Sequence, residues 1–185
     1  MRLAILAAAL ALAGCAFSAD TPLFSPEDAV FPIADGAIVE MRDPEHVDEI
    51  ERLRFRATPS GYIIEEPGAA EGAGDDRPVL FVAVQETPEE DYIIVLPQDG
   101  PGSGANFAFA WRAADGLHLI SNPREFEDTP DARAWLDAHT ETLSYGERRF
   151  TRREDVLAFH RDFIAPRFVR GGATPEDVIV LAEVR

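Results

Sequence analysis

The sequence predicts one α+β domain: an antiparallel meander sheet of about seven strands, able to curl into a partial barrel, with two C-terminal helices. Three observations predict this fold class. Strand-like runs separated by turn residues recur three times, a proline follows each return strand, and the hydrophobic period becomes helical after Pro123. An eight-stranded closed barrel of lipocalin type is the alternative.

The expected strands begin with residues 36–41 and continue as three β-hairpins. In each hairpin, turn chemistry interrupts a run of β-branched and aromatic residues. The proline after each return strand cannot donate to a sheet ladder and therefore ends it. The expected hairpins pair residues 53–58 with 62–66, 79–84 with 92–96, and 106–112 with 117–120.

Side-chain alternation predicts which strand faces are buried. The first hairpin strand alternates apolar residues with Arg52, Arg54 and Arg56, so we expect it to be half exposed. Both strands of the second hairpin are apolar on both faces, as in central strands. The third hairpin places aromatic residues, including Trp111, on one face and alanines on the other. We expect the alanine face to pack against a helix and the aromatic face to line a core or a pocket.

Two helices are expected near the C-terminus. Thr129 and Pro130 match an N-cap followed by a proline at the first helical position. The residues from Thr151 to Glu154 match a capping box, and the helix after them should end near Pro166. Residues 178–182 are expected to form a last strand, although a helix capped at Thr174 fits nearly as well.

The N-terminus carries a secretion signal. Met1-Arg2 is followed by eleven residues, 3–13, that are all Ala, Leu or Ile. Eleven helical residues reach only about 16 Å, so this apolar stretch predicts a signal peptide and not a membrane span. It ends in Leu12-Ala13-Gly14-Cys15, which resembles the lipobox of bacterial lipoproteins. The resemblance implies cleavage before Cys15, which then carries the lipid, including palmitate, as the membrane anchor.

The expected organisation follows from this motif. Residues 1–14 form the signal peptide, residues 15–35 the lipidated N-terminus and a tether, and residues 36–185 the single α+β domain. Within the tether, Ser25 and Pro26 could cap and open one helical turn. Ala16 after the cysteine resembles a lipoprotein directed to the outer membrane rather than the inner one, so the expected location is the periplasmic side of that membrane.

Composition limits the partners. The chain has 34 acidic and 17 basic residues and a formal charge of -17, so a nucleic-acid phosphate backbone would be repelled. An anionic membrane would be repelled as well, which leaves the lipid on Cys15 as the means of attachment. The chain has one cysteine, so the exported domain can form no internal disulfide.

A search for chemistry finds no convergent site. The four histidines, His46, His118, His139 and His160, lack metal-ligand spacing, and no G-x-S-x-G elbow occurs. His46 with its acidic neighbours in residues 43–49, and the carboxylates of residues 86–91, are typical of solvated surfaces. The glycine-rich residues 99–104 lack the Lys-Ser/Thr pair of a phosphate loop. We therefore expect no cofactor, no metal site and no catalytic residue.

The expected function is a lipid-anchored envelope lipoprotein whose domain binds a small ligand or an envelope protein without catalysis. The first alternative is a periplasmic hydrolase with a His/carboxylate site assembled by folding. The second is an acidic inhibitor or immunity-type protein that meets a basic partner.

Overall fold

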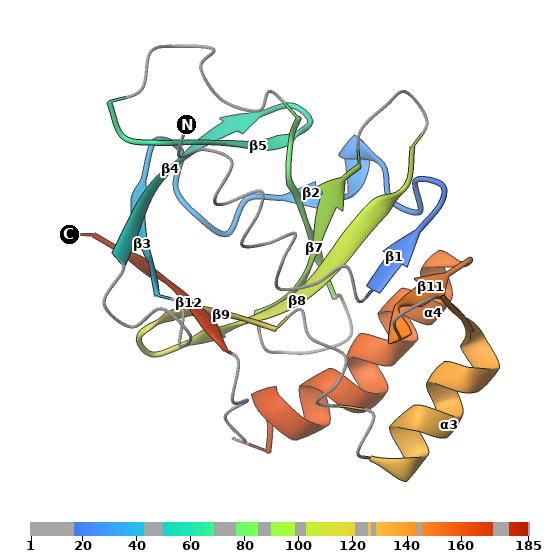
Figure 1. The fold of residues 1–185 in the computed structure, drawn as a ribbon. Helices are drawn as coiled ribbons and strands as arrows, with labels where there is room; N and C mark the ends of the chain where they lie inside the picture. The colour runs from blue at the N-terminus through green and yellow to red at the C-terminus, as the bar shows by residue number, and fades with distance from the viewer. Residues whose placement is uncertain are drawn as a thin grey trace.

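The computed structural model confirms the predicted α+β class: a nearly closed antiparallel barrel with two helices from the C-terminal part of the chain (Figure 1). It describes residues 17–42, 50–68, 77–84, 90–98, 103–120, 126, 129–143, 146–171 and 178–184. The lipobox and signal peptide lie outside these residues, as do His46 and the acidic cluster of residues 43–49.

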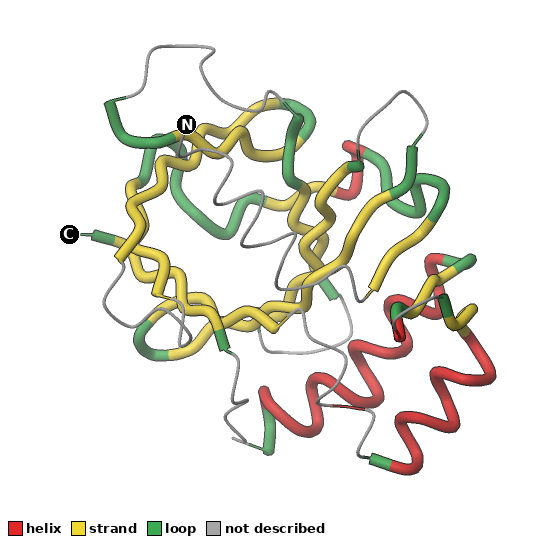
Figure 2. The backbone as a smooth tube through the Cα atoms, viewed as in Figure 1, coloured by secondary structure: helices red, strands yellow, loops and turns green. Residues whose placement is uncertain are grey.

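The barrel is a ring of strands that follow one another in chain order, and Figure 2 shows it end-on. Its strands are β3 (Ile38–Arg42), β4 (Ile50–Thr58), β5 (Gly61–Glu65), β6 (Leu80–Ala83), β7 (Asp91–Pro97), β8 (Ala105–Ala113), β9 (Gly116–Ile120) and β12 (Ile179–Glu183). The hairpins β4–β5, β6–β7 and β8–β9 and the final strand are therefore confirmed. β12 closes the ring between β9 and β3.

One bridge joins β5 to β6 and makes the ring nearly closed. The backbone groups of Tyr62 and Val79 exchange two hydrogen bonds of 2.8 Å. Gly61 precedes this bridge with φ of 122°, and a Cβ there would lie 2.6 Å from the Val79 carbonyl oxygen. Only glycine fits this turn without strain. The structure therefore has a ring of eight strands, as the lipocalin-type alternative does. Between β5 and β6, however, the ring is closed only by the Tyr62–Val79 pair.

The barrel interior is filled by one face of every ring strand. Its buried side chains include Phe55, Tyr62 and Phe81, whose rings meet edge to face. Residues 31–37 cross one end of the barrel, where Ile33 enters this cluster. The Ile33 N–H donates to the Tyr62 hydroxyl at 3.0 Å, and the hydroxyl donates to the Ile33 carbonyl. This end of the barrel is thus covered by the chain itself.

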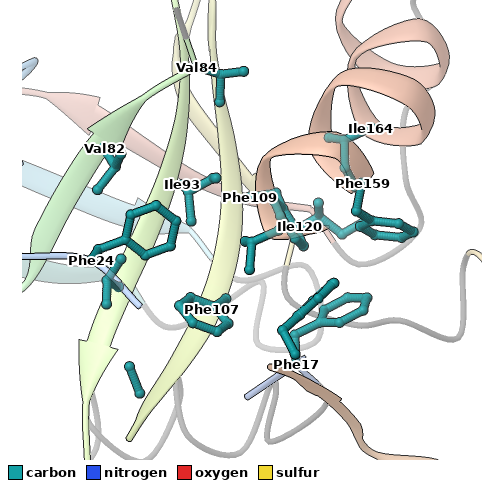
Figure 3. Close-up of a cluster of buried hydrophobic side chains, with 14 of the residues drawn as sticks. Phe17, Phe24, Val82, Val84, Ile93, Phe107, Phe109, Ile120, Phe159 and Ile164 are labelled. Carbon is teal, nitrogen blue, oxygen red and sulfur yellow. The ribbon is translucent and has the colours of Figure 1, made fainter. Parts of the chain in front are cut away.

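A second core lies between the barrel and the helices (Figure 3). Phe107, Phe109 and Trp111 of β8 project into it, whereas Ala108 and Ala110 face the barrel interior. The expected packing of the alanine face against a helix is therefore wrong. Ala108 and Ala110 share the barrel interior with the large rings of the other strands, and the aromatic rings of β8 fill the space beneath the helices. The aromatic face does line a core, as expected.

The helical layer comes from an excursion between β9 and β12. It contains α3 (Pro130–His139), β10 (Thr140–Thr142), β11 (Arg148–Phe150), α4 (Arg153–Phe159) and the π-helix η4 (His160–Val169). Thr129 and Pro130 begin α3 as predicted. The helix α4 begins one residue later than the expected capping box implies, and its N-cap, Arg152, makes no side-chain cap bond.

The helix also continues past Pro166 instead of ending near it. Residues from His160 to Val169 are wound as a π-helix, and the Arg170 N–H donates to the Ala165 carbonyl, five residues back, at 2.9 Å. In an α-helix the proline ring would clash with the carbonyl four residues back. The wider π-helical turn accommodates it, because its hydrogen bonds span five residues.

The N-terminal segment differs from the expected tether of residues 15–35, because from Phe17 onward it is packed into the fold. Phe17 is completely buried at the start of β1 (Phe17–Ala19), which pairs with β8 and, in parallel, with β11. The 3-10 helix η1 (Pro26–Asp28) and β2 (Ala29–Val30) follow, and β2 pairs with β6. Ser25 caps η1 as predicted, with its N–H bonded to Asp28 at 2.8 Å. The described segment from Phe17 onward is therefore part of the fold, because Phe17 and Phe24 belong to the second core.

Candidate functional site

The sequence candidates lie far apart in the fold or outside the described residues. Cys15, His46, Glu86 and Glu89 belong to the latter group. Glu90 of the predicted acidic turn accepts a hydrogen bond from Arg112 at 2.9 Å, as an ordinary surface ion pair does. The predicted surface position is wrong for Asp91, which is buried at the start of β7. Within the described part of the chain, no group of three or more His, Cys, Asp or Glu side chains could hold a metal ion.

His118 lies on the outer face of β9. Its Nε2 atom is 2.7 Å from Asp115 Oδ1, and its ring lies 5.7 Å from that of Trp111. The bond lowers the pKa of the Asp115 carboxyl below its usual value. Asp115 is an exposed residue of the β8–β9 turn, so His118 is a strand histidine hydrogen-bonded to a surface carboxylate.

His160 is a packing histidine at the junction of α4 and η4. Its ring is completely buried and lies 5.8 Å from Phe109. Among the described residues neither ring nitrogen has a hydrogen bond of ordinary geometry, although a backbone group of Ala110 interacts with the ring. Desolvation lowers the pKa of His160 to about 4, so the ring is neutral near pH 7.

His139, Asp155 and Arg152 form a polar cluster in the helical layer. His139 Nδ1 lies 3.1 Å from Asp155 Oδ1, and Arg152 holds both oxygens of the same carboxylate at 2.8 Å. The bond from Arg152 is the main cause of the lowered pKa of Asp155, against the effect of burial. The His139 ring stacks on Trp135, with centroids 4.2 Å apart and planes 10° apart.

This cluster could orient a general base, because a carboxylate that fixes Nδ1 leaves Nε2 of the imidazole available. Sequence reasoning missed it, since sixteen residues separate His139 from Asp155. The available signal was local: a histidine in the last turn of one helix and an aspartate in the first turn of the next. The described hydroxyls nearby have structural roles, because Thr140 donates to the Leu136 carbonyl and Thr142 accepts from Arg148.

The second feature is the barrel surface that faces away from the helices (Figure 1). We call it the outer wall and define it by the outward side chains of β12, β3, β4 and β5, which alternate with those of the interior cluster. They are Val180, Ala182, Val184, Ile38, Glu40, Arg42, Ile50, Arg52, Arg54, Arg56, Glu65 and Ile63, the last of which is buried. The structure thus confirms that β4 is half exposed, with its arginines outward.

Two of the four wall arginines are held by cross-strand ion pairs. Arg52 donates twice to Glu40, at 3.1 and 3.3 Å, and Arg56 donates twice to Glu65, at 2.9 and 3.1 Å. Arg42 reaches Glu40 at 3.5 Å. Arg54 stands between Ile38 and Glu65 in the strand register and has no ion pair with any described residue. The wall therefore carries four arginines against two glutamates.

The aromatic residues that could have lined a pocket are packed. Trp111 stacks on Phe168, with centroids 5.7 Å apart and planes 14° apart, and only 5% of Trp111 is exposed. Tyr92 is 8% exposed and belongs to the barrel interior.

Comparisons of the chain with protein-family models, curated proteins and solved structures found no match. The helices of the described residues include none that is both long and apolar enough to cross a membrane.

Proposed function

We propose that the chain is a lipid-anchored cell-envelope protein whose folded part is a non-catalytic interaction domain. The Leu12-Ala13-Gly14-Cys15 motif, placed directly after an apolar stretch of signal-peptide length, carries this proposal. Cys15 bears the lipid, and the domain faces the periplasm from the outer membrane.

The packed aromatic face favours a protein partner over a small ligand. Pockets for small molecules are lined by apolar and aromatic side chains that the ligand can reach. Here Trp111 is covered by Phe168, and Tyr92 lies in the barrel core. The polar surface that remains accessible suits recognition by another macromolecule.

The position of Phe17 supports close attachment to the membrane. Phe17 is buried in the sheet two residues after Cys15, and two extended residues span at most about 7 Å. A lipid on Cys15 would hold the domain close to the bilayer surface and not at the end of a long flexible linker.

Metabolic labelling with palmitate tests the anchor. The wild-type chain should incorporate the label and fractionate with membranes, whereas Cys15→Ala should do neither. Ser18→Ala is the matched control, because Ser18 lies three residues further on and should not affect acylation. Label retained in Cys15→Ala would contradict the anchor. Formaldehyde crosslinking of whole cells tests whether the folded part is an interaction domain. If it is, the chain should form at least one discrete crosslinked adduct with another protein.

One observation favours the hydrolase alternative. His139 is oriented by Asp155 and Arg152 in the way that a general base requires. Under this alternative, His139→Ala and Asp155→Asn should both abolish hydrolysis of a chromogenic ester by the purified chain. His118→Ala, which alters a histidine bound to an exposed aspartate, should leave it unchanged. No detectable hydrolysis by the wild type would remove this alternative.

A further inference from the structure

Charge is segregated on this acidic chain. The formal charge of the whole chain is -17, yet Arg42, Arg52, Arg54 and Arg56 outnumber Glu40 and Glu65 on the outer wall. Three of the arginines alternate along β4, so their side chains leave the same face of the strand roughly 7 Å apart. A basic surface of this kind attracts an acidic partner, while the rest of the domain repels one.

Arg54 is the arginine best placed to make a new contact. Its neighbours Arg52 and Arg56 are already held by Glu40 and Glu65. Each of these arginines donates two hydrogen bonds to its glutamate. Arg54 is only partly exposed and has no ion pair with a described residue, so its guanidinium can bind a carboxylate without breaking an ion pair within the described part of the chain. Arginine is well suited to this because its planar fork binds both oxygens of a carboxylate.

The wall also carries apolar side chains. Ile50 is 56% exposed and Val184 is 45% exposed, two of the most exposed large hydrophobic residues of the described chain. Val184 adjoins β3, since its N–H donates to the Ile38 carbonyl, and Ile38 is the register neighbour of Arg54. Arginine beside exposed aliphatic residues is the composition of a protein interface. A free inorganic anion would make no use of the aliphatic residues.

The position of the wall disfavours the membrane as its occupant. β1, which follows Cys15 by one residue, pairs with β8 and β11 beside the helices, and Figure 1 shows β3, β4 and β12 on the opposite side of the barrel. A lipid on Cys15 would draw the side with β1 toward the bilayer. The outer wall then faces away from the bilayer.

We infer that the outer wall docks an acidic surface of another protein, with Arg54 as the central contact to a carboxylate. This inference rests on the proposed function and names the surface and the chemistry of its partner. It also runs opposite to the inhibitor or immunity alternative, in which the acidic surface of this chain would meet a basic partner.

Site-specific photocrosslinking in cells that produce the full chain tests the inference. A benzophenone amino acid replaces Val184 on the wall or, as the control, Ala134 on the exposed side of α3. Position 184 should give one discrete adduct with another protein, joined at a segment rich in Asp and Glu, and position 134 should not give that adduct.

Charge variants then test Arg54. In the background that carries the crosslinker at position 184, Arg54→Glu should reduce the adduct about tenfold or more, as reversal of a desolvated interface charge does. Arg54→Lys keeps the charge but loses the planar fork, so its adduct yield should lie between those of Arg54 and Arg54→Glu. Arg133→Glu, the same reversal on the exposed surface of α3, should leave it unchanged. The thermal unfolding midpoint of Arg54→Glu should match that of Arg133→Glu, which excludes misfolding as the cause.

Four outcomes would overturn the inference: no adduct from position 184, an adduct that survives Arg54→Glu, an adduct with lipid, or an adduct between two copies of this chain. Formaldehyde adducts separate this failure from failure of the proposed function. If formaldehyde still joins the chain to another protein, only the placement on the outer wall is lost. If it joins the chain to no protein, the interaction domain is lost as well.

Discussion

The hydroxyl group of Tyr62 both accepts the N–H of Ile33 and donates to its carbonyl. Through this pair, one side chain fixes the segment that covers the end of the barrel to the strand that closes the ring. Burial raises the pKa of the Tyr62 hydroxyl, so it remains protonated and able to donate over the physiological range.

Removing this hydroxyl should destabilise the fold. Tyr62→Phe leaves the Ile33 N–H and carbonyl buried without a partner, which costs about 1–3 kcal/mol. Urea unfolding followed by circular dichroism measures the change. Tyr92→Phe is the matched control, because the Tyr92 hydroxyl lies 3.4 Å from the exposed Glu90 and interacts otherwise with Arg112, so its loss strands no buried backbone group among these partners. Equal losses in the two variants would contradict a special role for Tyr62.

Gly61 provides a test of barrel closure. Gly61→Ala adds a Cβ that would lie 2.6 Å from the Val79 carbonyl oxygen, the atom that accepts the N–H of Tyr62. We expect a loss of about 3 kcal/mol in unfolding free energy, from the unfavourable φ together with the displaced bridge. Gly36→Ala is the control, since Gly36 also has positive φ but no atom within 4 Å of an added Cβ. Its loss should stay near 1 kcal/mol.

The elements that were predicted correctly depend on local chemistry. The hairpins β4–β5, β6–β7 and β8–β9 join runs that are close in sequence, so turn residues and alternation are enough to place them. The pairing of β1 with β11 joins Phe17 to Arg148 across the chain, and no local pattern specifies it. For the same reason the segment from Phe17 to Val30 was mistaken for a tether.

Face assignment failed for a related reason. Alternation separates Phe109 from Ala110 on β8, but it does not say which face the barrel encloses, because that depends on the curvature of the whole sheet. The contact between His139 and Asp155 needs the relative positions of α3 and α4 as well. The arginine face of β4, by contrast, could be predicted from the sequence, because an arginine occupies every second position from Arg52 to Arg56.

His160 should make stability depend on pH. Its pKa is about 4 in the folded chain and 6.5 in the unfolded chain, so the unfolded state takes up a proton first as the pH falls. The contribution of the neutral ring is present above pH 6.5 and is lost as the pH falls from 6.5 toward 4. Linkage gives a slope of about 1.4 kcal/mol per pH unit and a total of about 3 kcal/mol.

Urea unfolding of the wild type and His160→Leu at pH 7.5 and pH 5 isolates this contribution, because the acidic residues are common to both chains. The variant should lose less stability between the two pH values than the wild type. At pH 7.5 it should be nearly as stable as the wild type, since leucine removes buried polar atoms that lack hydrogen bonds of ordinary geometry. Identical pH profiles would show that His160 does not titrate in this range.

Asp155 should also make the fold less stable as the pH falls, but at a lower pH than His160. Its contacts join α3 to α4, so a variant at this position tests that contact. Its pKa is lowered by Arg152 first and also by His139, so its stabilising effect exists above the ordinary carboxyl pKa and is lost as the pH falls through the lowered value. Asp155→Asn weakens the contact to His139 and the two bonds from Arg152 at a buried position, and should cost about 1–3 kcal/mol at pH 7. Asp162→Asn is the control, because Asp162 also pairs with an adjacent arginine, Arg161, but both side chains are over 40% exposed. Its loss should stay below about 0.5 kcal/mol, as for other surface ion pairs, and a loss equal to that of Asp155→Asn would mean that burial does not strengthen the contact between α3 and α4.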